Sequence, residues 1–111
     1  MISRLSEYQV MWILVFFDLP TETKKQKKAY MDFRKNLLRD GFIMFQFSIY
    51  IRHCASRENM EVHTKRVKSC IPLEGTVGLL TITDKQFSEI LIYEGQKTIK
   101  SSAPGLQLEL F

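Results

Sequence analysis

Length, composition and charge already limit the class of this chain. Its 111 residues, 45% hydrophobic and 25% charged, are typical of one globular domain. No stretch approaches the roughly 20 apolar residues of a membrane span, and the polar segment 1–10 does not resemble a signal peptide. We therefore expect a cytoplasmic protein with no membrane partner. The formal net charge of +4 favours an anionic partner.

The N-terminal half predicts a strand followed by a helix. The apolar run over 11–17 is typical of a strand that is buried on both faces. A helix is then expected to extend to about Arg39. Thr23 and Gln26 have the spacing of a capping box at its start, and Gly41 suits a C-cap at its end.

The C-terminal half predicts further strands and a second helix. The expected elements are a strand over 42–51, a loop over 52–55, a helix capped by Ser56 and ending near Cys70, a strand over 76–83, one helical turn over 84–87 and a strand over 90–93. If one strand is split, the order is βαββαβ, and the long strand could bend and pair with itself near Arg52. A strict count gives βαβαββ. A ferredoxin-like sandwich of the α/β (α+β) class, with two helices on one face of a sheet, fits best.

The end of the chain differs from the rest. Residues 94–105 are polar, whereas 106–111 alternate, with three leucines on one face: Leu106, Leu108 and Leu110. Such a strand is expected to dock on a sheet edge, either its own or a partner's. The predicted organisation is a ferredoxin-like domain over 1–93, including an N-terminal extension over 1–10, and a tail with a docking strand over 94–111.

The first predicted helix carries most of the positive charge. Between Glu22 and Arg39, seven basic residues oppose two acidic ones. Four of the basic residues fall on one stripe at about 100° per residue: Lys24, Lys28, Lys35 and Arg39. Arg34 is a further candidate. The alternative is a solvated face that keeps the helix soluble, but the strong bias of sign favours binding to nucleic-acid phosphates without base specificity.

Asp18 is the first candidate for chemistry. It follows the apolar strand directly, where metal ligands and catalytic groups often lie in α/β layers, although it could equally begin the turn to the helix. Other candidates are weaker. His53 and His63 lack partners at ligand spacing and suit surface or capping roles. Cys54 and Cys70 indicate two reduced thiols.

Several segments together resemble a known family. Phe-Phe-Asp-Leu-Pro ends the first strand at 16–20, a basic helix covers 28–38, Gly-Phe-Ile-Met-Phe-Gln-Phe-Ser-Ile-Tyr follows at 41–50, and Thr-Ile-Thr-Asp-Lys-Gln-Phe lies at 81–87. This pattern resembles the small CRISPR-associated protein that partners the adaptation integrase, the second core protein of CRISPR systems. The similarity is greatest to members from type II systems and covers roughly residues 11–93.

The resemblance implies a ferredoxin-like homodimer in which Asp18 faces its mate near the two-fold axis. Mg²⁺ between the two carboxylates would make a metal-dependent endonuclease that acts on RNA or DNA. The chain departs from members described as nucleases at two positions. Phe17 stands where they often carry a tyrosine, and Met44 where they often carry an arginine.

The resemblance also implies an architectural role in spacer acquisition. The homodimer would bridge two integrase dimers and carry the double-stranded prespacer DNA on its basic surface. The stripe on the first helix suits phosphate contacts, and the tail strand suits docking to the integrase. We take this adaptor as the leading hypothesis and the Asp18 endonuclease as its alternative. A protein-interaction or small-molecule sensor domain is the third class.

Overall fold

The computed structural model describes residues 10–99, with side chains as far as residue 96. The elements follow in the order β1 (Met11–Asp18), α2 (Lys24–Arg39), β2 (Ile43–Gln46), β3 (Ile49–Cys54), α3 (Arg57–Ser69), β4 (Thr76–Thr83), α4 (Asp84–Ser88), β5 (Ile92–Glu94) and β6 (Lys97–Ile99). None of the helices in this range is long and apolar enough to cross a membrane.

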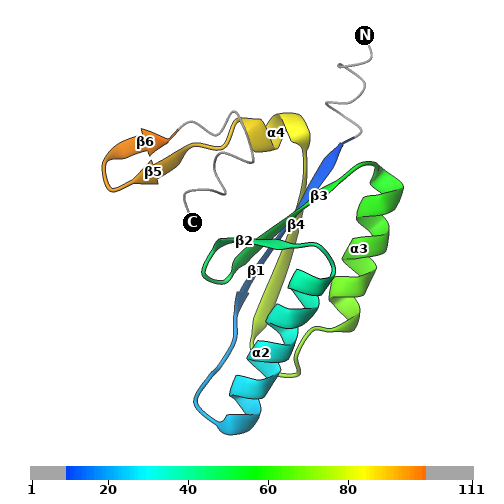
Figure 1. The fold of residues 1–111 in the computed structure, drawn as a ribbon, viewed down its shortest axis with the longest axis vertical. Coiled ribbons are helices and arrows are strands. Elements are labelled where there is room, and N and C mark those ends of the chain that lie inside the picture. The colour runs from blue at the N-terminus through cyan, green and yellow to red at the C-terminus, as the bar shows by residue number, and fades with distance from the viewer. Residues whose placement is uncertain (1–9, 100–111) are drawn as a thin grey trace.

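Four strands form one antiparallel sheet in the order β2-β3-β1-β4, so β1 is central. Helices α2 and α3 lie side by side along one face of this sheet (Figure 1). The first six elements therefore follow the order βαββαβ, which confirms the predicted ferredoxin-like α+β fold.

Local capping signals set the ends of both long helices. Thr23 and Gln26 form the complete predicted capping box at the start of α2, and Ser56 accepts a hydrogen bond from the Asn59 backbone at the start of α3. Gly41 has φ +89°, the left-handed conformation that suits the residue after a helix C-cap. The helix boundaries agree with the sequence because these signals act within one turn.

The single strand expected over 42–51 is wrong, whereas the alternative of a split strand, which gives the order βαββαβ, is confirmed. The chain forms a hairpin instead, in which β2 and β3 pair around a turn at Phe47 and Ser48. No Gly, Asn, Asp or Pro marks this turn. Ser48 itself adopts the left-handed φ of +69°, and the pairing of β2 with β3 shifts register between Met44 and Gln46. The loop expected over 52–55 is also wrong, because β3 extends to Cys54.

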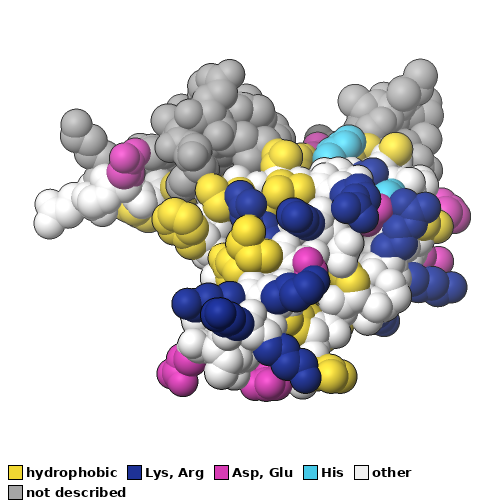
Figure 2. All heavy atoms as spheres, turned by 60° about the horizontal axis from the view of Figure 1, so that its bottom comes forward, with side chains coloured by type: hydrophobic (Ala, Val, Ile, Leu, Met, Phe, Trp, Pro, Cys, Tyr) yellow, Lys and Arg dark blue, Asp and Glu magenta, His cyan; other side chains and the backbone are white. Residues whose placement is uncertain are grey.

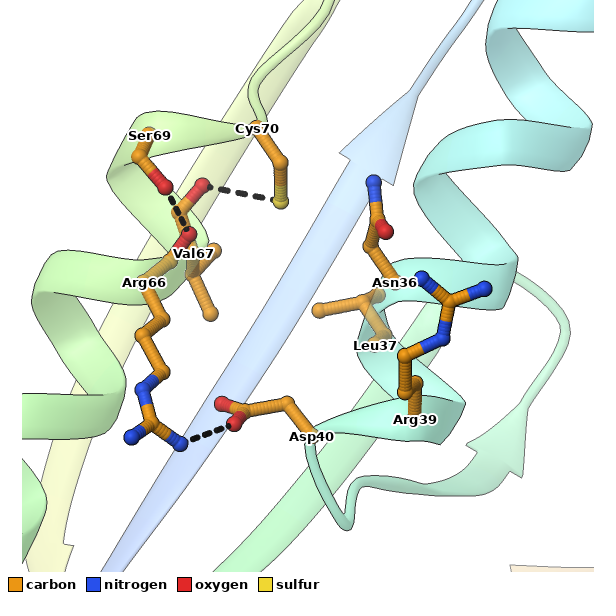
Figure 3. Close-up of a pocket in the computed structure, with 8 residues that line it drawn as sticks. All are labelled: Asn36, Leu37, Arg39, Asp40, Arg66, Val67, Ser69 and Cys70. Carbon is orange, nitrogen blue, oxygen red and sulfur yellow. Dashed lines mark hydrogen bonds and ion pairs between the residues drawn. The ribbon is translucent and has the colours of Figure 1, made fainter.

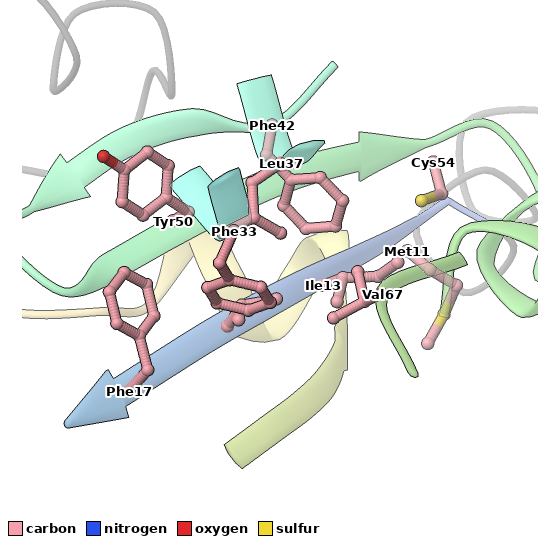
Figure 4. Close-up of a cluster of buried hydrophobic side chains, with 10 residues drawn as sticks. Met11, Ile13, Phe17, Phe33, Leu37, Phe42, Tyr50, Cys54 and Val67 are labelled. Atoms are coloured by element: carbon pink, nitrogen blue, oxygen red, sulfur yellow. The ribbon is translucent and has the colours of Figure 1, made fainter. Parts of the chain in front are cut away.

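The larger core lies between the sheet and helices α2 and α3. It contains ten buried side chains: Met11, Ile13, Val15, Phe17, Phe33, Leu37, Phe42, Tyr50, Cys54 and Val67 (Figure 4). Alternate residues of β1 point into it, as the two-residue period of a strand requires. Cys54 and Cys70 are free thiols, and burial raises the pKa of each above its ordinary value, so both stay protonated at neutral pH.

A smaller core covers one end of the opposite face. Trp12 stacks on Phe87 of α4 at 4.0 Å and donates a hydrogen bond from Nε1 to Asp84 Oδ1 at 2.7 Å. Phe45, Ile51 and Ile92 complete this cluster. Trp12 and Tyr50 are thus core residues, the interpretation that the sequence favoured.

The other end of this face is uncovered. We call it the open face, and define it by Phe16, Asp18, Leu80 and Gly78. The expectation that β1 is buried on both sides is wrong at this end, because Phe16 is 48% exposed and Leu80 is 49% exposed. A Cβ atom on Gly78 would lie 2.3 Å from the Phe16 ring, so the ring rests directly on the glycine. The long apolar run therefore packs against the helices on one face, and on the other face it contributes Trp12 to the smaller core and the exposed Phe16 to the open face.

The chain after α4 leaves the main sheet. The strand predicted over 90–93 is displaced to Ile92–Glu94, where it pairs with β6 in a hairpin that is separate from the four-stranded sheet (Figure 1). This hairpin spans the boundary predicted between residues 93 and 94, and the division into domain and tail stays a prediction. The leucines Leu106, Leu108 and Leu110 lie outside the described residues.

Candidate functional site

Asp18 ends β1 with an exposed side chain on the open face. It lines a hollow of about 300 Å³ with Phe16 and Phe47, and with the hydroxyl-bearing residues Ser48 and Thr76. The backbone here is fixed from both sides. The Phe17 N–H donates to the Ser48 carbonyl at 3.0 Å, and a Cβ atom on Gly75 would lie 2.7 Å from the Asp18 carbonyl oxygen.

This hollow supplies only part of a metal site. Between residues 10 and 96, no group of three or more His, Cys, Asp or Glu side chains could hold a metal ion. Mg²⁺ needs few protein oxygens, often one or two carboxylates. Asp18 is the carboxylate of this hollow, so within one copy of the chain the hollow offers Mg²⁺ a single carboxylate ligand.

The two departures from the nuclease pattern lie on the other side of the sheet. Phe17 is buried in the core beneath α2, where its ring packs edge to face on Phe33 at 5.2 Å. Phe17 also borders the Asp18 hollow, but successive residues of a strand point to opposite faces, so its buried ring points away from the Asp18 carboxylate. Met44 points to the same core.

The basic stripe of α2 is exposed, as its helical spacing predicts. Lys24, Lys28, Lys35 and Arg39 all face solvent, and the opposite side of α2 buries Phe33 and Leu37. Lys28 pairs with Asp32 at 2.9 Å, but an exposed pair of this kind contributes little to stability. Viewed toward the lower end of the helices, Lys and Arg side chains gather across the surface and outnumber acidic ones (Figure 2).

Helix α3 continues this basic surface. Its exposed cations are Arg57, Lys65, Arg66 and Lys68. We refer to these residues and the α2 stripe together as the basic helical surface. Arg34 differs from them, because its Nε donates a 2.7 Å hydrogen bond to the Tyr50 hydroxyl and its side chain is half-buried. Arg34 thus ties α2 to β3.

A partly buried cluster of Asp40, His63 and Arg66 joins the two helices, and no pattern in the sequence predicts it. His63 Nδ1 lies 2.8 Å from Asp40 Oδ2, and Arg66 donates to Asp40 Oδ1 at 2.9 Å. Burial alone would raise the pKa of Asp40, but the hydrogen bonds and charges of Arg66 and His63 outweigh burial and hold this pKa below its ordinary value. The surface or capping role expected for His63 is wrong, because its side chain is buried against this carboxylate.

Comparisons with known proteins identify the family. The family model for CRISPR associated protein Cas2 matches residues 11–90. A protein of Flavobacterium psychrophilum is 58% identical over 109 residues, which cover 98% of this chain and 95% of the relative. A protein of Parvibaculum lavamentivorans is 54% identical over 101 residues, covering 91% of this chain and all of the relative.

A more distant relative from Streptococcus mutans is 39% identical over 87 residues, which cover 78% of this chain and 80% of the relative. All three relatives carry the name CRISPR-associated endoribonuclease Cas2. The family match covers the whole ferredoxin-like part of the chain, β1 to β4. The chain therefore belongs to the CRISPR-associated Cas2 family.

Proposed function

We propose that this protein is a homodimeric adaptor in CRISPR spacer acquisition that binds double-stranded prespacer DNA and bridges integrase dimers. The observation that carries the proposal is the basic helical surface. Its cations project from two rigid helices, and point charges on a rigid support suit phosphates spaced along a duplex. Family membership supports the CRISPR role.

The open face supports the homodimer. Its exposed apolar side chains, Phe16 and Leu80, lie on the opposite side of the sheet from α2 and α3. Two such sheets stacked face to face would bury these side chains, and the basic helical surface of each copy would stay free for DNA. Asp18 lies on the same face, so the two Asp18 carboxylates would approach each other in this arrangement.

The salt dependence of duplex binding tests the adaptor. Each neutralised phosphate adds about 0.9 to the slope of log K against log salt, so four contacts per subunit would give a steep dependence. We expect Lys35→Glu to weaken binding and flatten this slope. Lys85→Glu, the same change on α4, is the matched control and should have a small effect. A shallow slope in the unmodified protein would contradict phosphate binding.

The name of the relatives and the exposure of Asp18 favour a second candidate, a metal-dependent endoribonuclease. When bound, Mg²⁺ would supply a more acidic water as nucleophile and would stabilise charge on the phosphate. Asp18 from each copy would hold the ion. Cleavage of single-stranded RNA should then require Mg²⁺ and disappear in Asp18→Asn, whereas Asp32→Asn, an exposed aspartate on α2, should retain it. Metal-independent cleavage that survives in Asp18→Asn would exclude this role.

The tail with Leu106, Leu108 and Leu110 remains the proposed integrase contact, by addition of a strand to a sheet edge. Co-purification with the integrase, with and without residues 94–111, tests this contact. Retention of the complex by the shortened chain would argue against it.

A further inference from the structure

A hollow of about 350 Å³ lies between α2 and α3 (Figure 3). We call it the interhelix hollow. Its polar lining comes from the last turns of the two helices and the residues that cap them: Asn36, Arg39 and Asp40 from α2, and Arg66, Ser69 and Cys70 from α3. Figure 3 places Asn36 and Arg39 beside each other on α2 and Arg66 across the hollow on α3. Two guanidinium groups from separate helices therefore border one space.

These side chains have hydrogen-bond donors to spare. Within residues 10–96, the Arg39 guanidinium has no hydrogen-bond or ion-pair partner, and neither does the side-chain amide of Asn36. Arg66 uses one guanidinium nitrogen for Asp40 at 2.9 Å, which leaves its other N–H groups available. A guanidinium carries five N–H donors in all, so a single contact does not exhaust it.

Some of the groups that would repel an anion already have partners. Carbonyls in the last turn of a helix usually lack partners and give this end a negative character. Here the Asn36 carbonyl accepts from the Asp40 N–H at 3.0 Å, and the Val67 carbonyl accepts from the Cys70 N–H at 3.0 Å. Asp40, the one acidic residue of the lining, is held by His63 and Arg66.

We propose that the interhelix hollow is a phosphate-binding site, in which Arg39 and Arg66 hold the phosphate from opposite sides and Asn36 is a third donor. The planar fork of arginine matches phosphate oxygens two at a time. Arg39 belongs both to the exposed stripe of α2 and to the hollow, so a nucleic-acid backbone that follows the stripe reaches the hollow. The phosphate would be either an internal phosphodiester or a terminal phosphate of DNA. This assignment of its source rests on the proposed DNA-binding function.

Inorganic phosphate tests the site without DNA. In a titration of ¹⁵N-labelled full-length protein followed by NMR, we expect saturable shifts of the Asn36 side-chain amide and of the Nε–H signals of Arg39 and Arg66. Arg39→Gln should weaken phosphate binding about tenfold, the effect of one lost charge-assisted hydrogen bond. Arg66→Lys should also weaken it, since lysine can keep the charge beside Asp40 but loses the fork. Lys85→Gln on α4 is the control for loss of charge.

Shifts that spread over all exposed lysines, or that persist in both arginine variants, would overturn the site. Two duplexes of one sequence, with 5′-hydroxyl or 5′-phosphate ends, then identify the source. Equal losses of affinity for both duplexes in Arg39→Gln assign an internal phosphodiester. A loss confined to the 5′-phosphate duplex assigns a terminal phosphate.

The outcomes also separate this inference from the proposed function. The unmodified protein could bind neither duplex while inorganic phosphate still shifts the NMR signals of Asn36, Arg39 and Arg66. The proposed DNA function would then fail, and the phosphate site would stand. If both duplexes bind but Arg39→Gln and Arg66→Lys weaken them no more than Lys85→Gln does, the DNA function stands and the interhelix hollow is overturned.

Discussion

Substitution of Leu80 by glutamate tests the proposed homodimer at the middle of the open face. Leu80 pairs with Leu14 across β1 and β4 and projects from the uncovered side of the sheet. The change places a carboxylate among apolar side chains that a second copy would cover. A folded monomer should tolerate it, because Leu80 is 49% exposed in the single chain and glutamate can remain in water there.

The size of the effect follows from burial and symmetry. Full burial of a leucine contributes about 1.5–3 kcal/mol, so the exposed half of Leu80 contributes about 1 kcal/mol per copy. A carboxylate buried without a partner costs several kcal/mol more. In a two-fold interface each substitution is present in both copies, so its free-energy cost applies twice. We therefore expect the dimer to weaken by at least about 4 kcal/mol, roughly a thousandfold increase in its dissociation constant.

Sedimentation velocity over a range of concentrations measures this constant, and circular dichroism reports the fold. Leu73→Glu is the matched control, since Leu73 is fully exposed in the loop between α3 and β4 and lies outside the open face. The reasoning is refuted if Leu80→Glu, still folded, dimerises as tightly as the unmodified chain, or if Leu73→Glu dissociates the dimer to the same extent.

Three further predictions concern stability. Asp40→Asn should cost about 1–3 kcal/mol at neutral pH. Because the pKa of Asp40 is lowered in the folded state, the stability that its carboxylate contributes is complete above its unfolded pKa of about 3.9 and is lost as pH falls through the folded-state pKa. The urea unfolding curves of Asp40→Asn and the unmodified protein should therefore converge in acid and stay apart in alkali. Gly78→Ala should destabilise the fold by about 1 kcal/mol, because the added methyl group displaces the Phe16 ring. In a Phe16→Ala background this cost should disappear, which a double-mutant cycle followed by thermal melting measures. Additive effects of the two substitutions would contradict the contact. Ser48→Gly should stabilise by up to about 1 kcal/mol by relieving the left-handed φ of +69°, and unchanged or lower stability would show that this turn is not strained.

The parts of the site that the sequence predicted are those defined by one element alone. Asp18 at the end of β1 and the exposed stripe of α2 follow from an apolar run and from helical spacing. Arg34 was predicted to bind nucleic acid because of its charge and its basic neighbours on the helix. Its Nε instead donates a hydrogen bond to the hydroxyl of Tyr50, sixteen residues away, and helical spacing cannot predict such a contact. Phe17 and Met44 looked like changes beside Asp18, but their strands turn both side chains to the helical side of the sheet.

What the sequence by itself determined was local: the capped helices, the strand over 76–83 and the basic excess on α2. These features depend on residues within one helical turn or on strand alternation, so single-chain patterns contain them. The tertiary structure alone decided the hairpin at Phe47 and Ser48, the uncovered open face, and the joining of Asp40 to His63 and Arg66 across 23 and 26 residues. Such contacts are set by how separate elements pack, and the same packing brings Arg39 and Arg66 to opposite sides of one hollow.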